Sequence, residues 1–145
     1  MKLAMIGGGG FRTPLVYRAL LLDRDPGRVD EVALIDTDGT RLRTMARILE
    51  DQARELPDAP RVSVHTDAEE GLRGADFVFS AIRVGGMAGR ATDERIGLSH
   101  GVIGQETVGF GGISYALRTL PVAMQLAELI QRVAPDAWVI DFTNP

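Results

Sequence analysis

The stretch Lys2-Leu-Ala-Met-Ile-Gly-Gly-Gly-Gly-Phe-Arg-Thr-Pro14 decides how the rest of the chain is interpreted. An apolar run ends in four consecutive glycines, and a helical pattern begins a few residues later. Glycines let backbone N–H groups approach an anion closely, and the positive end of the following helix faces it. This order of strand, glycine loop and helix predicts a phosphate-binding turn. The alternative is a glycine-rich turn that only reverses the chain.

Apolar runs and helical patterns alternate along the rest of the chain. Helical spacing predicts a helix after Pro14, a second after Asp38 and a long third over about 113–133, with Pro121 near its first turns. Four further strands are expected at 31–36, 61–65, 76–82 and 137–141, with Trp138 and both phenylalanines of the fourth strand in the core.

Strands that alternate with helices require a parallel sheet with right-handed crossovers. We therefore predict an α/β, doubly wound, Rossmann-like fold with five strands in the order 3-2-1-4-5. Residues 1–145 are expected to form one domain. Because a complete fold of this type usually has a sixth strand, we expect a chain truncated before a catalytic, substrate-binding domain.

Asp36 closes the predicted second strand, where a carboxylate can accept both ribose hydroxyls of NAD. A 2′-phosphate would be repelled there, so the sequence favours NAD over NADP. The alternative is a solvated carboxylate or a helix cap, and Asp38 competes for the ribose position.

The segment from Arg83 to Gly112 changes character, because nine of the 17 glycines fall within it. Glycines in Arg83-Val-Gly-Gly86 would let the nicotinamide half of the dinucleotide lie close to the chain. We expect an irregular loop with substrate contacts. Composition alone favours solvated surface for Asp93-Glu-Arg95 and Gly104-Gln-Glu-Thr107.

Bulk composition excludes several classes of protein. The formal net charge of −4 provides no large positive field, so we expect no nucleic-acid partner. There is no cysteine, and the two histidines have no partner at metal-ligand spacing, so we expect no metal site in these residues. No apolar run approaches the ~18 residues that cross a bilayer. The N-terminus lacks a signal-peptide layout, and we expect a cytoplasmic protein without membrane contact.

Several ordered blocks resemble glycoside hydrolase family 4. Gly7-Gly-Gly-Gly-Phe-Arg-Thr-Pro14 is similar to the Gly-Gly-Gly-Ser-x-x-Thr-Pro opening of that family, and Asp141-Phe-Thr-Asn-Pro145 to its Asn-Phe-Thr-Asn-Pro block. Other blocks that look like successive family segments are Arg83-Val-Gly-Gly86, Asp93-Glu-Arg-Ile96, Gly101-Val-Ile-Gly-Gln-Glu-Thr107, Leu117-Arg-Thr-Leu-Pro121 and Pro135-Asp-Ala-Trp138. The sequences Arg-Val-Gly-Gly and Gly-Gln-Glu-Thr resemble the 6-phospho-β-glucosidase branch more than the α-glucosidase or galacturonidase branches.

The resemblance implies a homo-oligomeric glycosidase that depends on NAD and a divalent metal, expected to be Mn²⁺, and acts on a phosphorylated sugar. In this family the sugar is oxidised at C3, a tyrosine removes the C2 proton and the aglycone leaves C1, outside the usual two-carboxylate scheme. The family's metal-binding cysteine and histidine and its tyrosine base lie beyond the Asn-Pro block. We therefore expect no catalytic residue in this chain and no activity from it alone.

Carried over by position, the resemblance also implies individual contacts. Arg95 matches the arginine expected on the sugar phosphate, which a guanidinium can bind bidentately. Asn144 matches the asparagine that touches sugar hydroxyls, and Glu106 lies in the block nearest the reacting centre. The expected cofactor-binding residues are Gly7, Gly8, Gly9, Gly10, Phe11, Arg12, Asp36, Arg83, Val84, Gly85 and Gly86.

Three residues depart from the family pattern, namely Phe11, Val108 and Phe110. Phe11 replaces the usual small residues after the glycines, where it would crowd or stack in the loop. Val108 and Phe110 stand where the family usually has a polar or small residue and a proline, so these two bear on substrate preference. Two other interpretations use the same fold. One is an NAD-dependent hydroxyacid dehydrogenase of the lactate/malate type, and the other is a nucleotide-binding module without chemistry.

Overall fold

The computed structural model describes residues 1–143, which group into two compact units. The first, called the sheet unit here, consists of Met1–Ala81 and Leu129–Phe142. The second, called the helical unit, is built on Ile82–Glu128.

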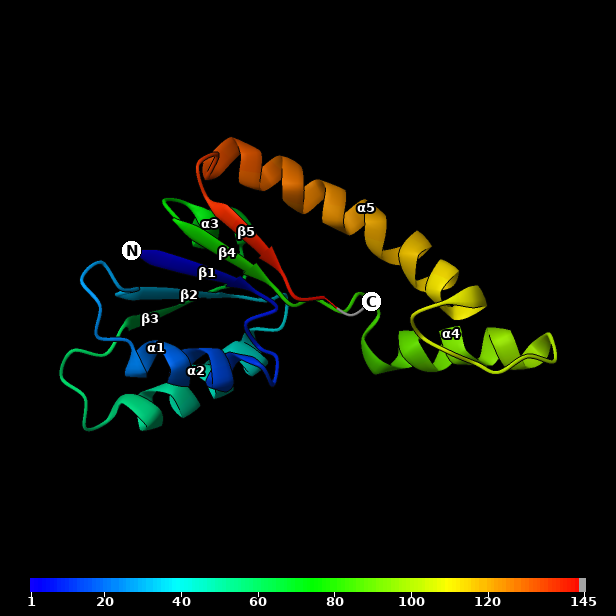
Figure 1. The fold of residues 1–145 in the computed structure, drawn as a ribbon, viewed down its shortest axis with the longest axis horizontal. Helices are drawn as coiled ribbons and strands as arrows, with labels where there is room; N and C mark the ends of the chain where they lie inside the picture. Colours follow the sequence, from blue (N-terminus) through cyan, green and yellow to red (C-terminus); the bar gives the residue numbers. More distant parts are fainter. Residues whose placement is uncertain (144–145) are drawn as a thin grey trace. The chain divides into compact units, whose positions relative to one another are not determined.

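A five-stranded parallel sheet in the order β3-β2-β1-β4-β5 forms the sheet unit, which confirms the predicted α/β fold and strand order (Figure 1). Ile6 at the end of β1 pairs with Ile35 of β2 and with Ser80 of β4. The residues that follow these three strands therefore emerge at one edge of the sheet. The strands are β1 (Lys2–Ile6), β2 (Glu31–Ile35), β3 (Arg61–His65), β4 (Phe77–Ser80) and β5 (Trp138–Asp141).

Local sequence signals explain where the helices of the sheet unit begin. Pro14 lies in the first turn of α1 (Thr13–Leu22), where its missing N–H is not needed. Asp38 caps α2 (Gly39–Ala53), because its carboxylate accepts the N–H groups of Thr40 at 2.9 Å and Arg41 at 3.1 Å. Asp67 caps the short α3 (Ala68–Leu72) in the same way.

Both faces of the central strands are buried, as expected for parallel strands covered by helices. Helices α1 and α2 lie on one face and α3 on the other (Figure 1). On the α3 side, Gly71 leaves no room for a side chain against Ile35. The core on the α1 and α2 side consists of Leu3, Met5, Tyr17, Leu21, Val29, Val32, Leu34, Leu42, Met45 and Leu49.

The expectation of an irregular loop from Arg83 to Gly112 is wrong, because residues Gly86–Ser99 form helix α4. Glycines that suggested a loop serve close packing instead. A side chain on Gly97 would come within 3.1 Å of the Gly104 Cα atom, and one on Gly89 within 3.1 Å of the Arg118 guanidinium. The intrinsic cost of glycine in a helix, about 1 kcal/mol each, is therefore outweighed by tertiary contact.

Helix α5 (Gly109–Val133) begins earlier than its apolar pattern predicts. Pro121 consequently lies well inside the helix and not near its first turns. The backbone at Gly109 has φ +64°, a conformation that favours glycine and marks the entry to this helix.

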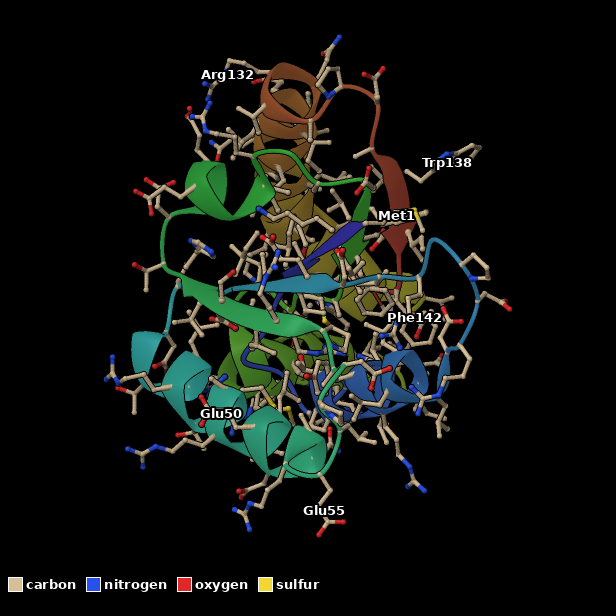
Figure 2. All side chains as sticks on the ribbon, turned by 90° about the vertical axis from the view of Figure 1, so that its left-hand side faces the viewer. Met1, Glu50, Glu55, Arg132, Trp138 and Phe142 are labelled. Atoms are coloured by element: carbon tan, nitrogen blue, oxygen red, sulfur yellow. The ribbon has the colours of Figure 1, made fainter. Side chains whose placement is uncertain are left out.

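The placement of Trp138 in the core is also wrong. Its side chain is 75% exposed and projects from the sheet unit (Figure 2). Strand β5 is paired only with β4 among the described residues, so all four of its residues are exposed. Phe77 and Phe79 of β4 pack against the core as partly buried residues.

Two adjacent leucines of α1 provide a matched test of this core. Leu21 is 6% exposed and Leu22 is 72% exposed. We expect Leu21→Ala to lower the free energy of unfolding by about 2–5 kcal/mol, because it leaves a cavity. Leu22→Ala should change it by less than about 0.5 kcal/mol. Urea denaturation of both variants checks this, and equal losses would contradict the packing of α1.

Candidate functional site

The glycine loop after β1 lies directly on the end of β2. Backbone N–H groups of Gly7 and Gly8 both donate to the carbonyl of Ile35 at 2.9 Å. A side chain on Gly8 would come within 2.9 Å of the Ile35 backbone nitrogen, so no other residue fits without a shift. Gly7 has φ +83°, and its carbonyl accepts the N–H of Gly10 at 2.9 Å. The loop is thus a tight turn whose shape requires these glycines.

Thr13 connects this loop to the start of α1. Its hydroxyl donates to the carbonyl of Gly8 at 2.9 Å, and the side chain is buried. Pro14 follows at once, so the helix N-terminus is held against the loop. A helix N-terminus beside glycine backbone is the arrangement that binds a phosphate.

Asp36 bridges the loop and the entry to α2. One carboxylate oxygen, Oδ2, accepts the N–H of Gly9 at 3.1 Å, and the other, Oδ1, accepts the N–H of Asp38 at 3.1 Å. Asp38 instead caps α2, where the N–H of Arg41 lowers the pKa of its carboxyl. Of the two aspartates, Asp36 is therefore the one beside the glycine loop. A carboxylate keeps further lone pairs for hydroxyl donors.

Phe11 and Arg12 form an aromatic and cationic rim on the same loop. The guanidinium of Arg12 lies 5.0 Å from the ring centre of Phe11 and 5.1 Å from that of Phe142. Phe142 in turn stacks on Phe79 of β4 with 5.6 Å between ring centres. These cation–π contacts hold Arg12 beside the loop, and among residues 1–143 no carboxylate pairs with its guanidinium.

In the helical unit, Glu106 is bracketed by two arginines. Its Oε2 lies 3.4 Å from Nη2 of Arg83 and 3.2 Å from Nε of Arg90. Arg90 also donates to Glu94 at 2.8 Å, one turn along α4. Solvated surface is thus the wrong interpretation of Glu106, whose side chain is 20% exposed.

Asp93 forms a buried ion pair with Arg118 that sequence reasoning missed. Its side chain is 1% exposed and accepts two hydrogen bonds from Arg118, at 3.0 and 2.6 Å, and one from Ser114 at 2.7 Å. The Arg118 guanidinium lowers the pKa of the Asp93 carboxyl. Solvated surface is again the wrong interpretation. The partners lie 25 residues apart in the chain, so no local spacing reveals them.

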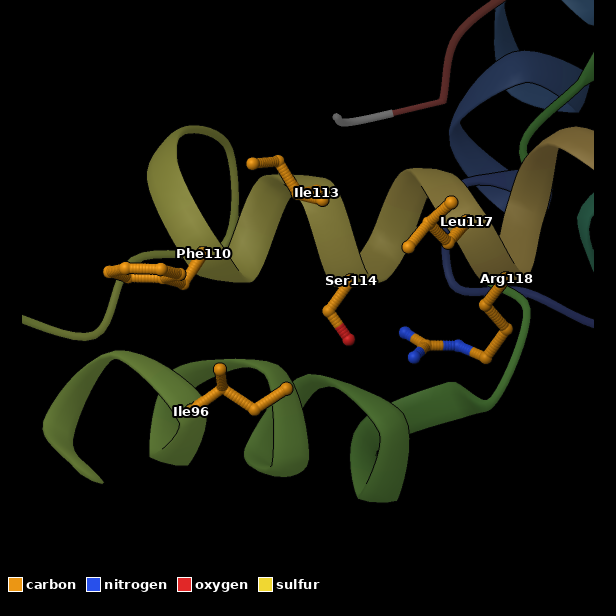
Figure 3. A pocket seen from close by; sticks show the side chains of 6 residues that line it. All are labelled: Ile96, Phe110, Ile113, Ser114, Leu117 and Arg118. Atoms are coloured by element: carbon orange, nitrogen blue, oxygen red, sulfur yellow. The ribbon is translucent and has the colours of Figure 1, made fainter. Parts of the chain in front are cut away.

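A mostly apolar pocket of about 530 Å³ opens between α4 and α5 within the helical unit (Figure 3). The polar ends of Ser114 and Arg118 point toward α4, where Asp93 engages both. The lining residues are Ile96, Phe110, Ile113, Ser114, Leu117 and Arg118.

Two of the three expected substrate contacts, Arg95 and Glu106, lie in the helical unit. Arg95 is exposed on α4, and the ion pairs of Glu106 are with Arg83 and Arg90. Asn144 lies outside the described residues. Within residues 1–143, no group of three His, Cys, Asp or Glu side chains could hold a metal ion. None of the helices described here is long and apolar enough to cross a membrane.

Two curated bacterial proteins are similar to almost the whole of this chain. The 6-phospho-α-glucosidase 1 of Lacticaseibacillus paracasei is 37% identical over 96% of this chain and 31% of its own length. The 6-phospho-β-glucosidase of Escherichia coli is 38% identical over 100% of this chain and 33% of its own length. The chain thus spans about a third of the length of these relatives.

Solved structures give the same result. The 6-phospho-β-glucosidase of Thermotoga maritima, solved with manganese, NAD⁺ and glucose-6-phosphate, superposes with a TM-score of 0.92 at 33% identity. The match covers 100% of this chain and 35% of that chain. The malate dehydrogenase of Salinibacter ruber reaches a TM-score of 0.63 at 15% identity, over 100% of this chain and 37% of that chain, and shares the fold alone. The sequence profile of the family 4 glycosyl hydrolases matches residues 2–145, and the chain belongs to that family.

Proposed function

We propose that this chain is the NAD-binding part of a glycosidase that hydrolyses 6-phospho-β-glucosides. The observation that carries the proposal is the contact between the glycine loop and Asp36, at the edge where β1 and β2 end. In a doubly wound sheet this edge binds the pyrophosphate and the adenosine ribose of a dinucleotide. The NAD⁺ in the Thermotoga maritima structure supports the same assignment.

When bound, NAD⁺ would accept a hydride from C3 of the sugar, which acidifies the C2 proton and permits loss of the aglycone from C1, and the hydride would return to C3 after water adds, so that the net reaction is hydrolysis. The chain's own residues bind and orient. Gly7–Gly10 present N–H groups to the pyrophosphate, and Asp36 accepts the ribose hydroxyls. Arg12, Phe11 and the Arg83–Gly86 segment complete the proposed cofactor contacts. Metal dependence, a catalytic base and homo-oligomerisation are proposed for the full-length protein only.

On the substrate side, Arg95 is proposed to bind the sugar phosphate, Asn144 a sugar hydroxyl and Glu106 the region near the reacting carbons. Glucose-6-phosphate in the Thermotoga maritima structure supports a phosphorylated substrate. Relatives named as α- and β-glucosidases match almost equally, at 37% and 38% identity. The proposed preference for β-glucosides therefore rests on the sequences of the Arg83-Val-Gly-Gly86 and Gly104-Gln-Glu-Thr107 blocks.

Asp36 gives a test of the cofactor. We expect the full-length protein to bind NAD⁺ at least about tenfold more tightly than NADP⁺, because the carboxylate repels a 2′-phosphate. Asp36→Asn should weaken NAD⁺ and narrow this preference, as measured by calorimetry. Asp38→Asn is the matched control, because asparagine also caps helices well and should leave the preference unchanged. Tighter binding of NADP⁺ by the unmodified protein would refute the proposal.

Phosphate recognition is tested on two arginines of α4. We expect Arg95→Ala in the full-length protein to raise KM for 6-phosphoglucosides by about 10- to 100-fold, because a charge-assisted hydrogen bond is lost. Activity on glucosides without phosphate should change little.

Arg90→Ala is the matched comparison for this test, because Arg90 lies on the same helix and is already paired with Glu94 and Glu106. If Arg90→Ala, and not Arg95→Ala, removes the preference for phosphorylated substrates, the assignment of Arg95 is wrong.

Activity of the full-length protein on hydroxyacids instead of glucosides would favour the dehydrogenase alternative.

A further inference from the structure

We propose that Arg118 is a positioning residue that holds the Arg83–Gly86 turn in the shape that receives the nicotinamide half of the cofactor, with Asp93 fixing Arg118 in place. The inference rests on the proposed NAD-binding function. It concerns a residue on α5 that lies 34 positions from the turn along the chain.

Arg118 contacts the backbone of the turn directly. Its Nε donates to the carbonyl of Val84 at 2.9 Å, which ties the guanidinium to the turn's backbone. A side chain on Gly85 would come within 2.8 Å of that Nε atom. On the next turn of α4, Gly89 also lacks room for a side chain beside the guanidinium. Both glycines are therefore needed for Arg118 to reach Val84.

Gly85 also fixes the path of the backbone at this point. It has φ +85° and stands immediately before α4, in a conformation that strains other residues. The N–H of Gly86 donates to the carbonyl of Arg83 at 3.0 Å, which closes the turn. The Val84 carbonyl between them is the group that Arg118 captures.

The other end of the guanidinium is fixed by a buried carboxylate. Arg118 donates from Nη1 and Nη2 to the two oxygens of Asp93, a planar bidentate geometry that lysine cannot reproduce. Ser114 donates to the same carboxylate at 2.7 Å. Burying Asp93 without these partners would be costly, so the pair keeps one arrangement. Arg118 thus has one orientation available from which to reach Val84.

Tyr115 links the two arginines on either side of the turn. The guanidinium of Arg118 lies 5.6 Å from the Tyr115 ring centre, and that of Arg83 lies 5.7 Å from it. Arg83 begins the turn and Arg118 holds its second residue. One buried aromatic ring therefore restrains both cations.

The experiment compares NAD⁺ with ADP in the full-length protein by calorimetry. ADP carries the adenosine and pyrophosphate that we assign to Gly7–Gly10 and Asp36, but it lacks the nicotinamide half. We expect Arg118→Ala to raise the Kd for NAD⁺ about tenfold and to leave the Kd for ADP within about twofold. Arg118→Lys should bind NAD⁺ as weakly as Arg118→Ala does, because one ammonium cannot reach both Val84 and Asp93.

Arg132→Ala is the matched control for this experiment. Arg132 lies on the same helix but belongs to the sheet unit, where its 62% exposed side chain pairs with Glu69. It should change neither Kd. If Arg118→Ala fails to fold, Asp93→Asn keeps the shape of the buried side chain and should raise the Kd for NAD⁺ selectively.

Two outcomes would overturn the inference. Unchanged NAD⁺ affinity in folded Arg118→Ala would do so, and so would equal weakening of NAD⁺ and ADP, which would indicate general loss of structure. Absence of NAD⁺ binding by the unmodified protein would instead reject the proposed function itself.

Discussion

The close approach of the glycine loop to β2 is the constraint on which the sheet unit depends. Two N–H groups, from Gly7 and Gly8, share the carbonyl of Ile35, and a side chain at Gly8 would collide with the β2 backbone. The loop can lie there only because β1 and β2 are paired in register up to Ile6 and Ile35. Asp36, the residue that follows β2, is thereby placed where its carboxylate accepts the N–H of Gly9. Because Gly8 has no side chain, the loop can lie close enough to β2 for the groups proposed to bind phosphate and ribose to be neighbours.

The helical unit is organised by a different interaction, a buried ion pair. Asp93 and Arg118 bring α4 against α5, and a bidentate pair has far fewer acceptable geometries than an apolar contact. An apolar pair of similar volume could stabilise the helices as well, because buried charges lose hydration. Because the bidentate pair restricts the orientation of the Arg118 guanidinium, its Nε atom is held where it can bind the carbonyl of Val84 in the neighbouring turn.

Sequence reasoning was successful where the signal is local. Pro14 and the Asp38 cap mark helix starts, and apolar runs mark strands, so the strand order followed from the alternation of elements. It failed where a residue's role depends on distant contacts. Glycines of α4 resemble loop glycines until Arg118 and Gly104 are seen against them. Trp138 is apolar but lies on the edge strand, and burial there depends on what covers the edge rather than on residue type.

The arginines near the proposed cofactor contacts differ in how their charge is balanced, and this difference bears on their roles. Arg83 and Arg90 face Glu106, and Arg118 faces Asp93, so carboxylates neutralise these three. Arg12 has only the rings of Phe11 and Phe142 against it among the described residues. Aromatic faces attract a cation without cancelling its charge, so the guanidinium stays ordered and able to pair with an anion. Because Arg12 immediately precedes α1, this charge fits the proposal that Arg12 contacts a cofactor phosphate.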